Sequence, residues 1–223
     1  MKPFVCFMGL DGSGKSTGIE YARKTLAERG VRVRVVRAAY VVKIMSVFTK
    51  LGKKILMKGN SDPFSGDYKE YLEKMRKKAN SGGFYYKVFS AMTTLEFKMQ
   101  IFFNITLRRL FGQTLLVDRY IYDNAVTYAA NMGLGEDYMK KTIEGKWKRA
   151  PKPAKIIYIK TPIDVCLSRK DDIPDPLYLE IRKPLYEKIS DMYGATVISG
   201  DDGLERMQNE IMEAIDSVLD VKK

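Results

Sequence analysis

Residues 4–17 read Phe4-Val5-Cys6-Phe7-Met8-Gly9-Leu10-Asp11-Gly12-Ser13-Gly14-Lys15-Ser16-Thr17. The run before Gly9 is apolar and predicts a buried strand, while Lys15 opens a stretch whose apolar residues recur at helical spacing. Between them lies the spacing G-x-x-x-x-G-K-S, in a segment that we call the glycine-rich loop (residues 9–17). A strand, such a loop and a helix in this order are typical of a site that holds the phosphates of a nucleoside triphosphate.

The residue types of the glycine-rich loop are suited to phosphate binding. Its glycines let backbone N–H groups turn inward around phosphate oxygens. Lys15 supplies a positive charge to the β- and γ-phosphates, the Ser16 hydroxyl can ligate Mg²⁺, and the helix directs its positive end at the same anion. The sequence therefore predicts ATP and Mg²⁺ as cofactors, with these residues at the nucleotide: Gly9, Asp11, Gly12, Ser13, Gly14, Lys15, Ser16 and Thr17.

Length and composition limit the class of protein. With 223 residues, 45% of them hydrophobic, the chain can bury one large core, which predicts a single domain over residues 1–223. We expect a cytoplasmic protein, because the sequence shows no run of about 18 apolar residues and no charged-then-apolar leader. Histidine is absent, so catalysis must rest on carboxylates, Lys, Arg and Mg²⁺.

Apolar strand-like runs alternate with helical stretches, the pattern of an α/β protein whose parallel sheet is covered on both faces. The expected strands cover residues 4–8, 31–36, 114–117, 156–160 and 196–199. The expected helices cover residues 15–29, 68–79, 86–110 and 204–219. Residues 38–113, between the second and third strands, read mainly as helix and form an insert.

A second motif lies at the end of the third expected strand, where Asp118 and Arg119 follow an apolar run. The carboxyl ends of parallel strands form a binding crevice, so we expect Asp118 beside the glycine-rich loop, in reach of Mg²⁺. The planar fork of Arg119 can bridge transferred and accepting phosphates. The alternative is an ordinary ion pair at a strand end.

These motifs resemble those of the thymidylate kinases, a family of nucleoside monophosphate kinases. Residues 9–17 look like the family's phosphate loop, and residues 118–125 look like its Asp-Arg-Tyr segment. Residues 153–159, Pro162 and a helix reaching Arg169 are similar to its fourth strand and the start of its lid. The resemblance implies a P-loop kinase fold with five parallel strands in the order 2-3-1-4-5, an acceptor-binding helical insert over residues 38–113 and a short lid over residues 169–177.

The resemblance also implies roles for single residues. Asp11 faces the sugar of the acceptor, and Arg37 and Arg119 bind its phosphate. Lys98 stands near the place of an arginine that reads the base. The residues after Arg119 line the acceptor pocket: Tyr120, Asp123 and Asn124. Because Gly12 stands where an arginine could supply a cation to the transition state, that cation is expected from the lid, as Arg169 or Lys170.

Residues 41–110 hold 14 Lys and Arg against five Asp and Glu, most of the chain's net charge of +12. Such charge attracts a phosphorylated acceptor. There are two alternatives. Residues 84–87 could bind nucleic acid, and the apolar stripe of residues 41–57 could contact a membrane or a partner. Solvated helix faces, cores and dimer interfaces explain these patterns more often. We therefore expect a small phosphorylated acceptor as the partner, without nucleic acid or membrane, and leave a homodimer open.

Together these features predict a Mg²⁺-dependent kinase that transfers the γ-phosphoryl group of ATP to a deoxynucleoside monophosphate, with dTMP to dTDP as the first candidate. One alternative is a P-loop kinase for another small acceptor, such as a nucleoside or a non-nucleotide alcohol or phosphate. A hydroxyl acceptor would need a base, which Asp118, Asp11 or Asp123 would have to provide. The alternative from another class is a nucleotide-dependent protein that binds nucleic acid or a membrane surface.

Overall fold

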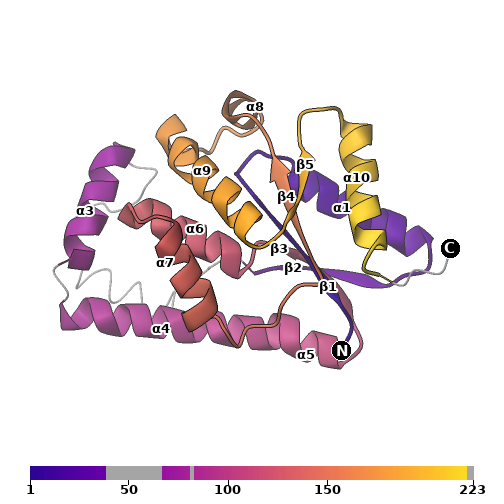
Figure 1. The fold of residues 1–223 in the computed structure, drawn as a ribbon, viewed down its shortest axis with the longest axis horizontal. Helices are drawn as coiled ribbons and strands as arrows, with labels where there is room; N and C mark the ends of the chain where they lie inside the picture. The colour runs from indigo at the N-terminus through magenta and orange to yellow at the C-terminus, as the bar shows by residue number, and fades with distance from the viewer. Residues whose placement is uncertain (39–66, 81–82, 220–223) are drawn as a thin grey trace.

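The computed structural model describes residues 1–38, 67–80 and 83–219, and Figure 1 shows the chain as a ribbon. Its centre is a sheet of five strands, all parallel, in the order β2-β3-β1-β4-β5. The strands are β1 (Phe4–Gly9), β2 (Val33–Arg37), β3 (Thr114–Asp118), β4 (Lys155–Lys160) and β5 (Thr196–Ser199). The expected α/β class, the five parallel strands and their order are thus confirmed.

The helices of the described residues follow the expected alternation. They are α1 (Lys15–Glu28), α3 (Tyr68–Asn80), α4 (Phe84–Ile101), α5 (Leu107–Leu110), α6 (Ile121–Met132), α7 (Glu136–Lys141), α8 (Ile163–Ser168), α9 (Pro176–Met192) and α10 (Leu204–Asp216). Two π-helical turns, η1 (Phe102–Thr106) and η2 (Thr142–Lys146), continue α4 and α7. The long helix expected over residues 86–110 is therefore α4, η1 and α5 in succession. The apolar stripe of residues 41–57 lies outside the described residues.

The start of the second strand differs from the expectation by two residues. Val31 does not enter the sheet, because its backbone N–H donates to the carbonyl of Leu26 at the end of α1, at 2.8 Å. Gly30 adopts a positive φ of 75° between them, as at many helix ends. Val31 thus caps the helix, and the strand begins at Val33.

The two faces of the sheet bury separate apolar clusters, because successive side chains of a strand point to opposite faces. Val5 and Phe7 of β1 pack with α1 and α10, which lie side by side in Figure 1. Phe4, Cys6 and Met8 pack on the other face with residues of α4, α6 and α9. None of the described helices is long and apolar enough to cross a membrane.

The register of the sheet brings two sequence motifs together. Phe7 of β1 and Arg37 of β2 both lie opposite Asp118 of β3. The backbone N–H of Arg119 donates to the Phe7 carbonyl at 3.0 Å. The glycine-rich loop and the Asp118-Arg119 pair therefore meet at the carboxyl edge of the sheet, as expected.

Candidate active site

The glycine-rich loop adopts backbone angles that favour glycine. The φ angle is +145° at Gly9, +81° at Gly12 and +95° at Gly14. A Cβ atom at Gly9 would lie 2.6 Å from the Ile159 carbonyl oxygen, and one at Gly12 would lie 2.4 Å from the Cys166 carbonyl oxygen. Close packing of the loop against β4 and α8 therefore demands these two glycines, a reason that the sequence did not reveal.

Lys15 is buried at the centre of the glycine-rich loop. Its Nζ donates to the carbonyl oxygen of Leu10 and to Oγ of Ser13 at 3.3 Å. Burial and the nearby Arg119 lower the pKa of Lys15 to about 8. Gly14 precedes α1 without a side-chain cap, so no capping side chain competes for the first N–H groups of that helix. This is the arrangement in which a helix N-terminus binds an anion.

Arg119 joins the loop to α6 and α9. Its Nη2 lies 2.5 Å from Oδ1 of Asp11, and its Nη1 donates to the Tyr186 hydroxyl at 3.1 Å and to Oδ1 of Asp123 at 3.3 Å. The Tyr186 hydroxyl donates in turn to Asp123 at 2.8 Å. The Tyr178 hydroxyl donates to Oδ2 of Asp11 at 3.1 Å. We call these five residues the Arg119 cluster.

Charges in the Arg119 cluster offset the cost of burial. Burial alone would raise the pKa of Asp11, but Arg119 and Lys15 bring it below its ordinary value. Burial likewise opposes the charge on Arg119, yet Tyr186, Asp123 and Asp11 raise its pKa well above the ordinary value. For Asp123 burial prevails and raises the pKa, with Arg119 offsetting part of the effect. Arg119 and Asp11 are therefore both charged at neutral pH.

Asp118 ends β3 beside the Arg119 cluster. Its Oδ2 lies 3.7 Å from Nε of Arg37, whose side chain is 66% exposed. Its Oδ1 is buried and has no hydrogen-bond partner among the described residues. The hydroxyl-bearing Ser16 is exposed at the start of α1. A carboxylate oxygen without a donor and an exposed hydroxyl fit Mg²⁺, which takes one or two protein ligands when it is bound with phosphates.

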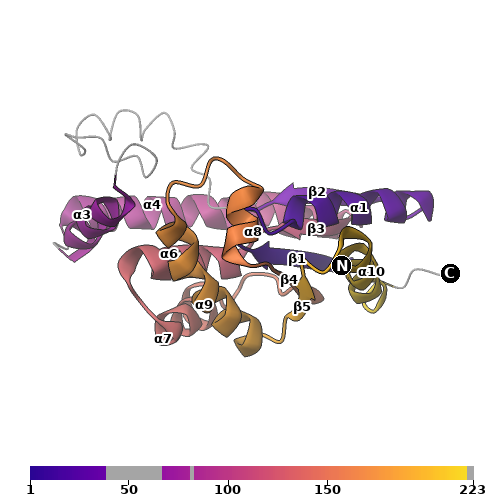
Figure 2. The same ribbon diagram turned by 90° about the horizontal axis from the view of Figure 1, so that it is seen from above.

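The two cations expected in the lid have different surroundings. Lys170 lies 3.9 Å from Oδ1 of Asp11 and 3.0 Å from Oδ1 of Asp172, so it borders the Arg119 cluster. Arg169 donates to the Gly200 carbonyl at 2.8 Å, and its Nη1 would lie 4.0 Å from a Cβ atom at Gly14. Figure 2 shows the connection that arches from α8 to α9 after these residues. Lys170 thus faces the cluster, while Arg169 lies along the glycine-rich loop.

Tyr120 and Lys98 lie outside the Arg119 cluster. The Tyr120 side chain is fully buried, and its hydroxyl donates to the Pro151 carbonyl at 2.9 Å. Its ring packs edge-to-face on Phe4, while its backbone N–H donates to Oδ2 of Asp123 at 3.0 Å. Lys98 is exposed on α4 and close enough to Lys146 of η2 to lower the pKa of that lysine. Asn124 is half-buried on α6.

Arg182 belongs to the surroundings of the cluster, although sequence reasoning gave it no role in a site. It is buried, and its Nη1 donates to the Tyr68 hydroxyl at 2.8 Å and to the Tyr178 carbonyl at 2.9 Å. Its Nη2 donates to Oδ1 of Asn131 at 2.8 Å, and its guanidinium lies 3.7 Å from the centre of the Tyr178 ring. Tyr178, Arg182 and Tyr186 repeat every four residues, a signal for one shared helix face.

The site thus combines a cradle for an anion, a buried arginine beside it and a buried carboxylate oxygen without a hydrogen-bond partner among the described residues. Compared with models of known protein families and with curated proteins, the chain matches none of them. The chemistry of these residues is therefore the basis on which a function can be inferred.

Proposed function

We propose that this protein is a Mg²⁺-dependent kinase that transfers the γ-phosphoryl group of ATP to a small phosphorylated acceptor, with dTMP as the first acceptor to test. The observation that carries the proposal is the placement of Arg119 at Asp11 of the glycine-rich loop, 2.5 Å away. Binding a triphosphate requires only the loop and its lysine. The permanently charged guanidinium of Arg119 beside them is suited to binding a second phosphate group.

On the donor side, the loop backbone and Lys15 would hold the triphosphate, as a P-loop does. Ser16 and Asp118 would hold Mg²⁺, which when bound offsets the charge that develops on the phosphates. Arg169 lies along the loop and can reach the same phosphates. Thr17, exposed beside Ser16, completes the first turn of α1 at this end.

On the acceptor side, Arg119 and the exposed Arg37 would hold the acceptor phosphate, and Lys170 would approach from the lid. An oxygen of the acceptor phosphate attacks the γ-phosphorus, and the bond from that phosphorus to the β–γ bridging oxygen breaks. ADP leaves with the electron pair. A phosphate oxygen is already nucleophilic at neutral pH, so the step needs positioning and electrostatic stabilisation without a general base.

A hydroxyl acceptor is the second candidate, favoured by Asp11. This carboxylate is charged at neutral pH because Arg119 and Lys15 offset the effect of its burial, so it could accept a proton from an alcohol. The position of Lys98 also widens the set of acceptors. Lys98 is exposed and neighbours Lys146 of η2, and no hydrogen bond or ion pair joins it to the Arg119 cluster among the described residues.

An acceptor screen tests the proposal. ADP release is measured with Mg²⁺ and ATP over dTMP, dUMP, other nucleoside monophosphates, nucleosides and non-nucleotide phosphates. We expect release that depends on one class of acceptor and is lost in Lys15→Ala. The matched control is Lys24→Ala, since Lys24 is an exposed lysine of the same helix. ATP hydrolysis that no acceptor stimulates, or that only DNA or RNA stimulates, would contradict the proposal.

A further inference from the structure

The outer side of α4 is unusually apolar. The described residues include fourteen exposed large hydrophobic side chains, and nine of them lie between residues 84 and 111. These nine are Phe84, Val88, Met92, Leu95, Met99, Phe102, Phe103, Leu110 and Phe111. Monomeric soluble proteins seldom gather exposed apolar side chains in this way without a partner.

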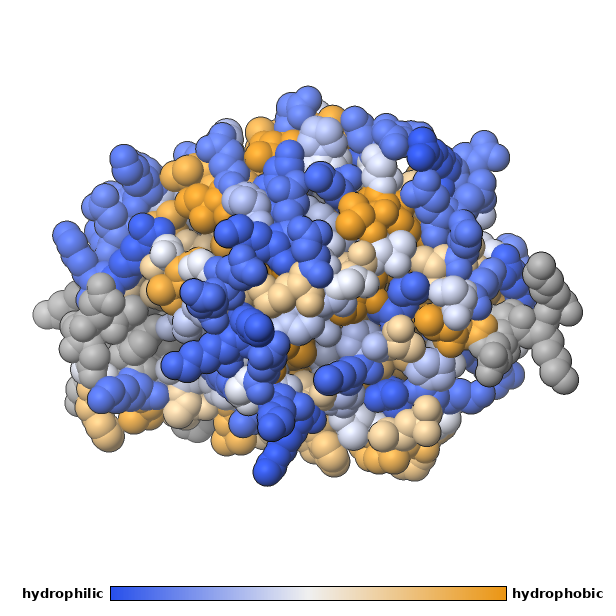
Figure 3. Space-filling model, in the orientation of Figure 1, coloured by the Kyte–Doolittle hydropathy of each residue, from blue (hydrophilic) through white to orange (hydrophobic). Residues whose placement is uncertain are grey.

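Six of these residues share one side of the helix. Val88, Met92, Leu95, Met99 and Phe102 follow one another at intervals of four and three, and Phe103 follows directly. We call these six residues the α4 outer face. The opposite side of the helix is buried through residues such as Phe97, whose ring lies 5.0 Å from that of Trp147. Figure 3 shows apolar side chains along much of the lower edge of the molecule, where α4 and α5 lie in Figure 1.

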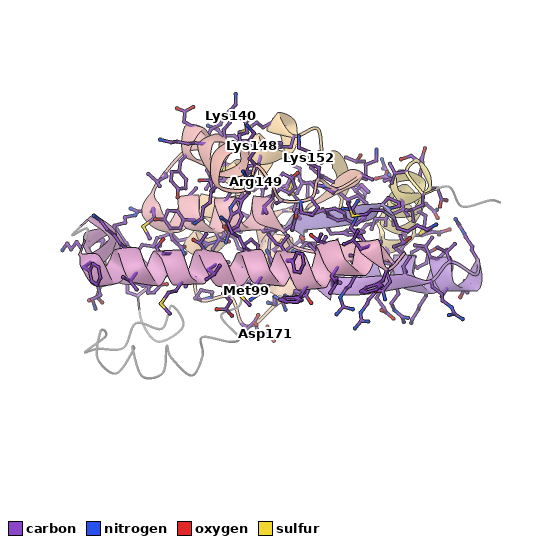
Figure 4. All side chains as sticks on the ribbon, turned by 90° about the horizontal axis from the view of Figure 1, so that it is seen from below. Met99, Lys140, Lys148, Arg149, Lys152 and Asp171 are labelled. Carbon is purple, nitrogen blue, oxygen red and sulfur yellow. The ribbon has the colours of Figure 1, made fainter. Side chains whose placement is uncertain are left out.

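Cations border the α4 outer face. Lys87 and Lys98 are exposed on α4 itself, and Lys146 of η2 lies near Lys98. Figure 4 shows four further cations on one side of α4, namely Lys140, Lys148, Arg149 and Lys152, whereas Met99 and the acidic Asp171 are labelled toward its other side. None of these seven forms an ion pair with another described residue. Partial burial and the neighbouring Lys98 lower the pKa of Lys146, as expected where positive charge lacks a counter-ion.

We propose that the α4 outer face and its basic border form a docking surface for an anionic phospholipid bilayer, with α4 lying in the plane of the bilayer surface. A helix with Phe, Leu and Met on one side and lysines at its borders is the usual form of such a contact. The rings of Phe102 and Phe103, 5.2 Å apart and both about half exposed, supply apolar surface that can enter the boundary between headgroups and acyl chains. The contact uses one side of a helix and requires no membrane-spanning segment.

Charge favours a bilayer over a second copy of the chain. Residues 84–111 contain four Lys and Arg and one acidic residue, Glu96, which is buried. Packing two copies through this face would bring like charges together, whereas anionic lipid attracts them. Sequence periodicity does not indicate this surface, because apolar residues on both sides of a helix predict that both sides are buried. This proposal is independent of the proposed phosphoryl transfer.

Co-sedimentation with vesicles, in the absence of ATP, tests the proposal. We expect the protein to sediment with vesicles of phosphatidylglycerol and phosphatidylcholine and to dissociate from them at high salt. Its affinity for vesicles of pure phosphatidylcholine should be lower by at least about tenfold. The double variant Leu95→Glu, Met99→Glu should lose at least about tenfold of the binding, since charged side chains are costly in the apolar layer. The matched control is Val197→Glu, Leu204→Glu, which changes two exposed apolar residues on other elements.

Thermal unfolding of each variant shows whether the fold is kept, and all these substitutions lie at exposed positions. Equal binding to neutral and anionic vesicles, or equal loss in the control variant, would overturn the proposal. So would a stable dimer in analytical ultracentrifugation that Leu95→Glu, Met99→Glu converts to a monomer while wild-type protein ignores vesicles. That last result would identify a second copy of the chain as the occupant.

Discussion

Arg119 sits at the point where the glycine-rich loop, β3 and α6 come together. Its backbone φ of +65° is uncommon for a residue with a side chain, and its guanidinium lies between the carboxylates of Asp11 and Asp123. Non-glycine residues in this conformation persist where surrounding contacts hold them, and they gather at functional sites. The Tyr186 hydroxyl fixes the fork by bonding both Arg119 and Asp123. The cluster therefore holds Arg119 in one orientation before any ligand binds.

Removing the charge of Arg119 should abolish transfer. Arg119→Gln leaves Asp123 buried without its cation, so we expect a loss of about 3–5 kcal/mol in the free energy of unfolding. The double variant Arg119→Gln, Asp123→Asn removes both charges and should recover much of that stability. In both variants we expect transfer to fall by about 10³-fold or more, with ATP still bound. Denaturant unfolding, ATP titration and the transfer assay give the three readouts.

A double variant that is stable and still transfers phosphate would contradict this role, because Arg119 would then be structural. Loss of ATP binding in a stable variant would make Arg119 a ligand of the donor. Either result is separable from misfolding, since the unfolding measurement is made on the same protein.

Lys15 should make ATP binding dependent on pH. Its pKa is lowered to about 8 by burial and by Arg119, against the opposing effect of Asp11, Asp123 and Asp118. Binding a polyanion favours the charged form, so affinity is highest below pH 8 and falls as Lys15 loses its proton. Each pH unit above about 8 should weaken binding by up to about tenfold. Titration of Mg²⁺ and ATP from pH 7 to 9.5 measures this, with Lys15→Arg as the control that stays charged and should remove the dependence.

Among the elements, α9 connects α3 to the Arg119 cluster. Two residues of α9, Tyr178 and Tyr186, belong to the Arg119 cluster. Between them in sequence, Arg182 donates to the Tyr68 hydroxyl at the start of α3. Nε of Arg76 on α3 also donates to the Asn131 carbonyl near the end of α6, at 3.2 Å, where a cation is favoured. Helix α3 is thus held to α6 and α9 by buried or half-buried polar contacts.

Replacing Arg182 should loosen α3 while the sheet stays intact. Arg182→Met keeps an apolar stem and removes the hydrogen bonds to Tyr68 and Asn131, which should cost roughly 1.5–3 kcal/mol locally. We expect faster amide hydrogen exchange in α3 and unchanged exchange in β1 and β3. Arg206→Met is the matched control, since that arginine is exposed on α10 and surface changes cost within about 0.5 kcal/mol. Unchanged exchange in α3 would show that Arg182 does not hold this helix.

At the scale of the whole molecule, the sheet was predictable because its signals are local. Apolar runs of strand length and their alternation with helices can be read along the chain. The position of the Asp118-Arg119 pair beside the glycine-rich loop follows from its place at the end of a parallel strand. The Arg119 cluster was less accessible, since Tyr178 and Tyr186 meet Asp11 and Asp123 only through tertiary packing. The roles of Tyr120 and Lys98 were tied to a resemblance. In the structure the Tyr120 hydroxyl bonds the Pro151 carbonyl, and Lys98 neighbours Lys146.

The outer face of α4 shows another limit of the sequence. Helix α4 carries apolar residues on its buried side and on its exposed side, so periodicity alone cannot tell which side is buried. The structure separates them, because Phe97 and Ile101 are buried whereas Leu95 is 60% exposed. Only the folded arrangement therefore reveals a surface that calls for a partner.

Transfer of the γ-phosphoryl group to an acceptor is what distinguishes a kinase from a hydrolase at this site. ATP labelled in its γ-phosphate is incubated with Mg²⁺ and the acceptor selected by the screen, and the label is followed by chromatography. We expect label on the acceptor in wild-type protein, with little inorganic phosphate, and no labelled acceptor in Arg119→Gln, Asp123→Asn. Label that appears only as inorganic phosphate, whatever the acceptor, would contradict it.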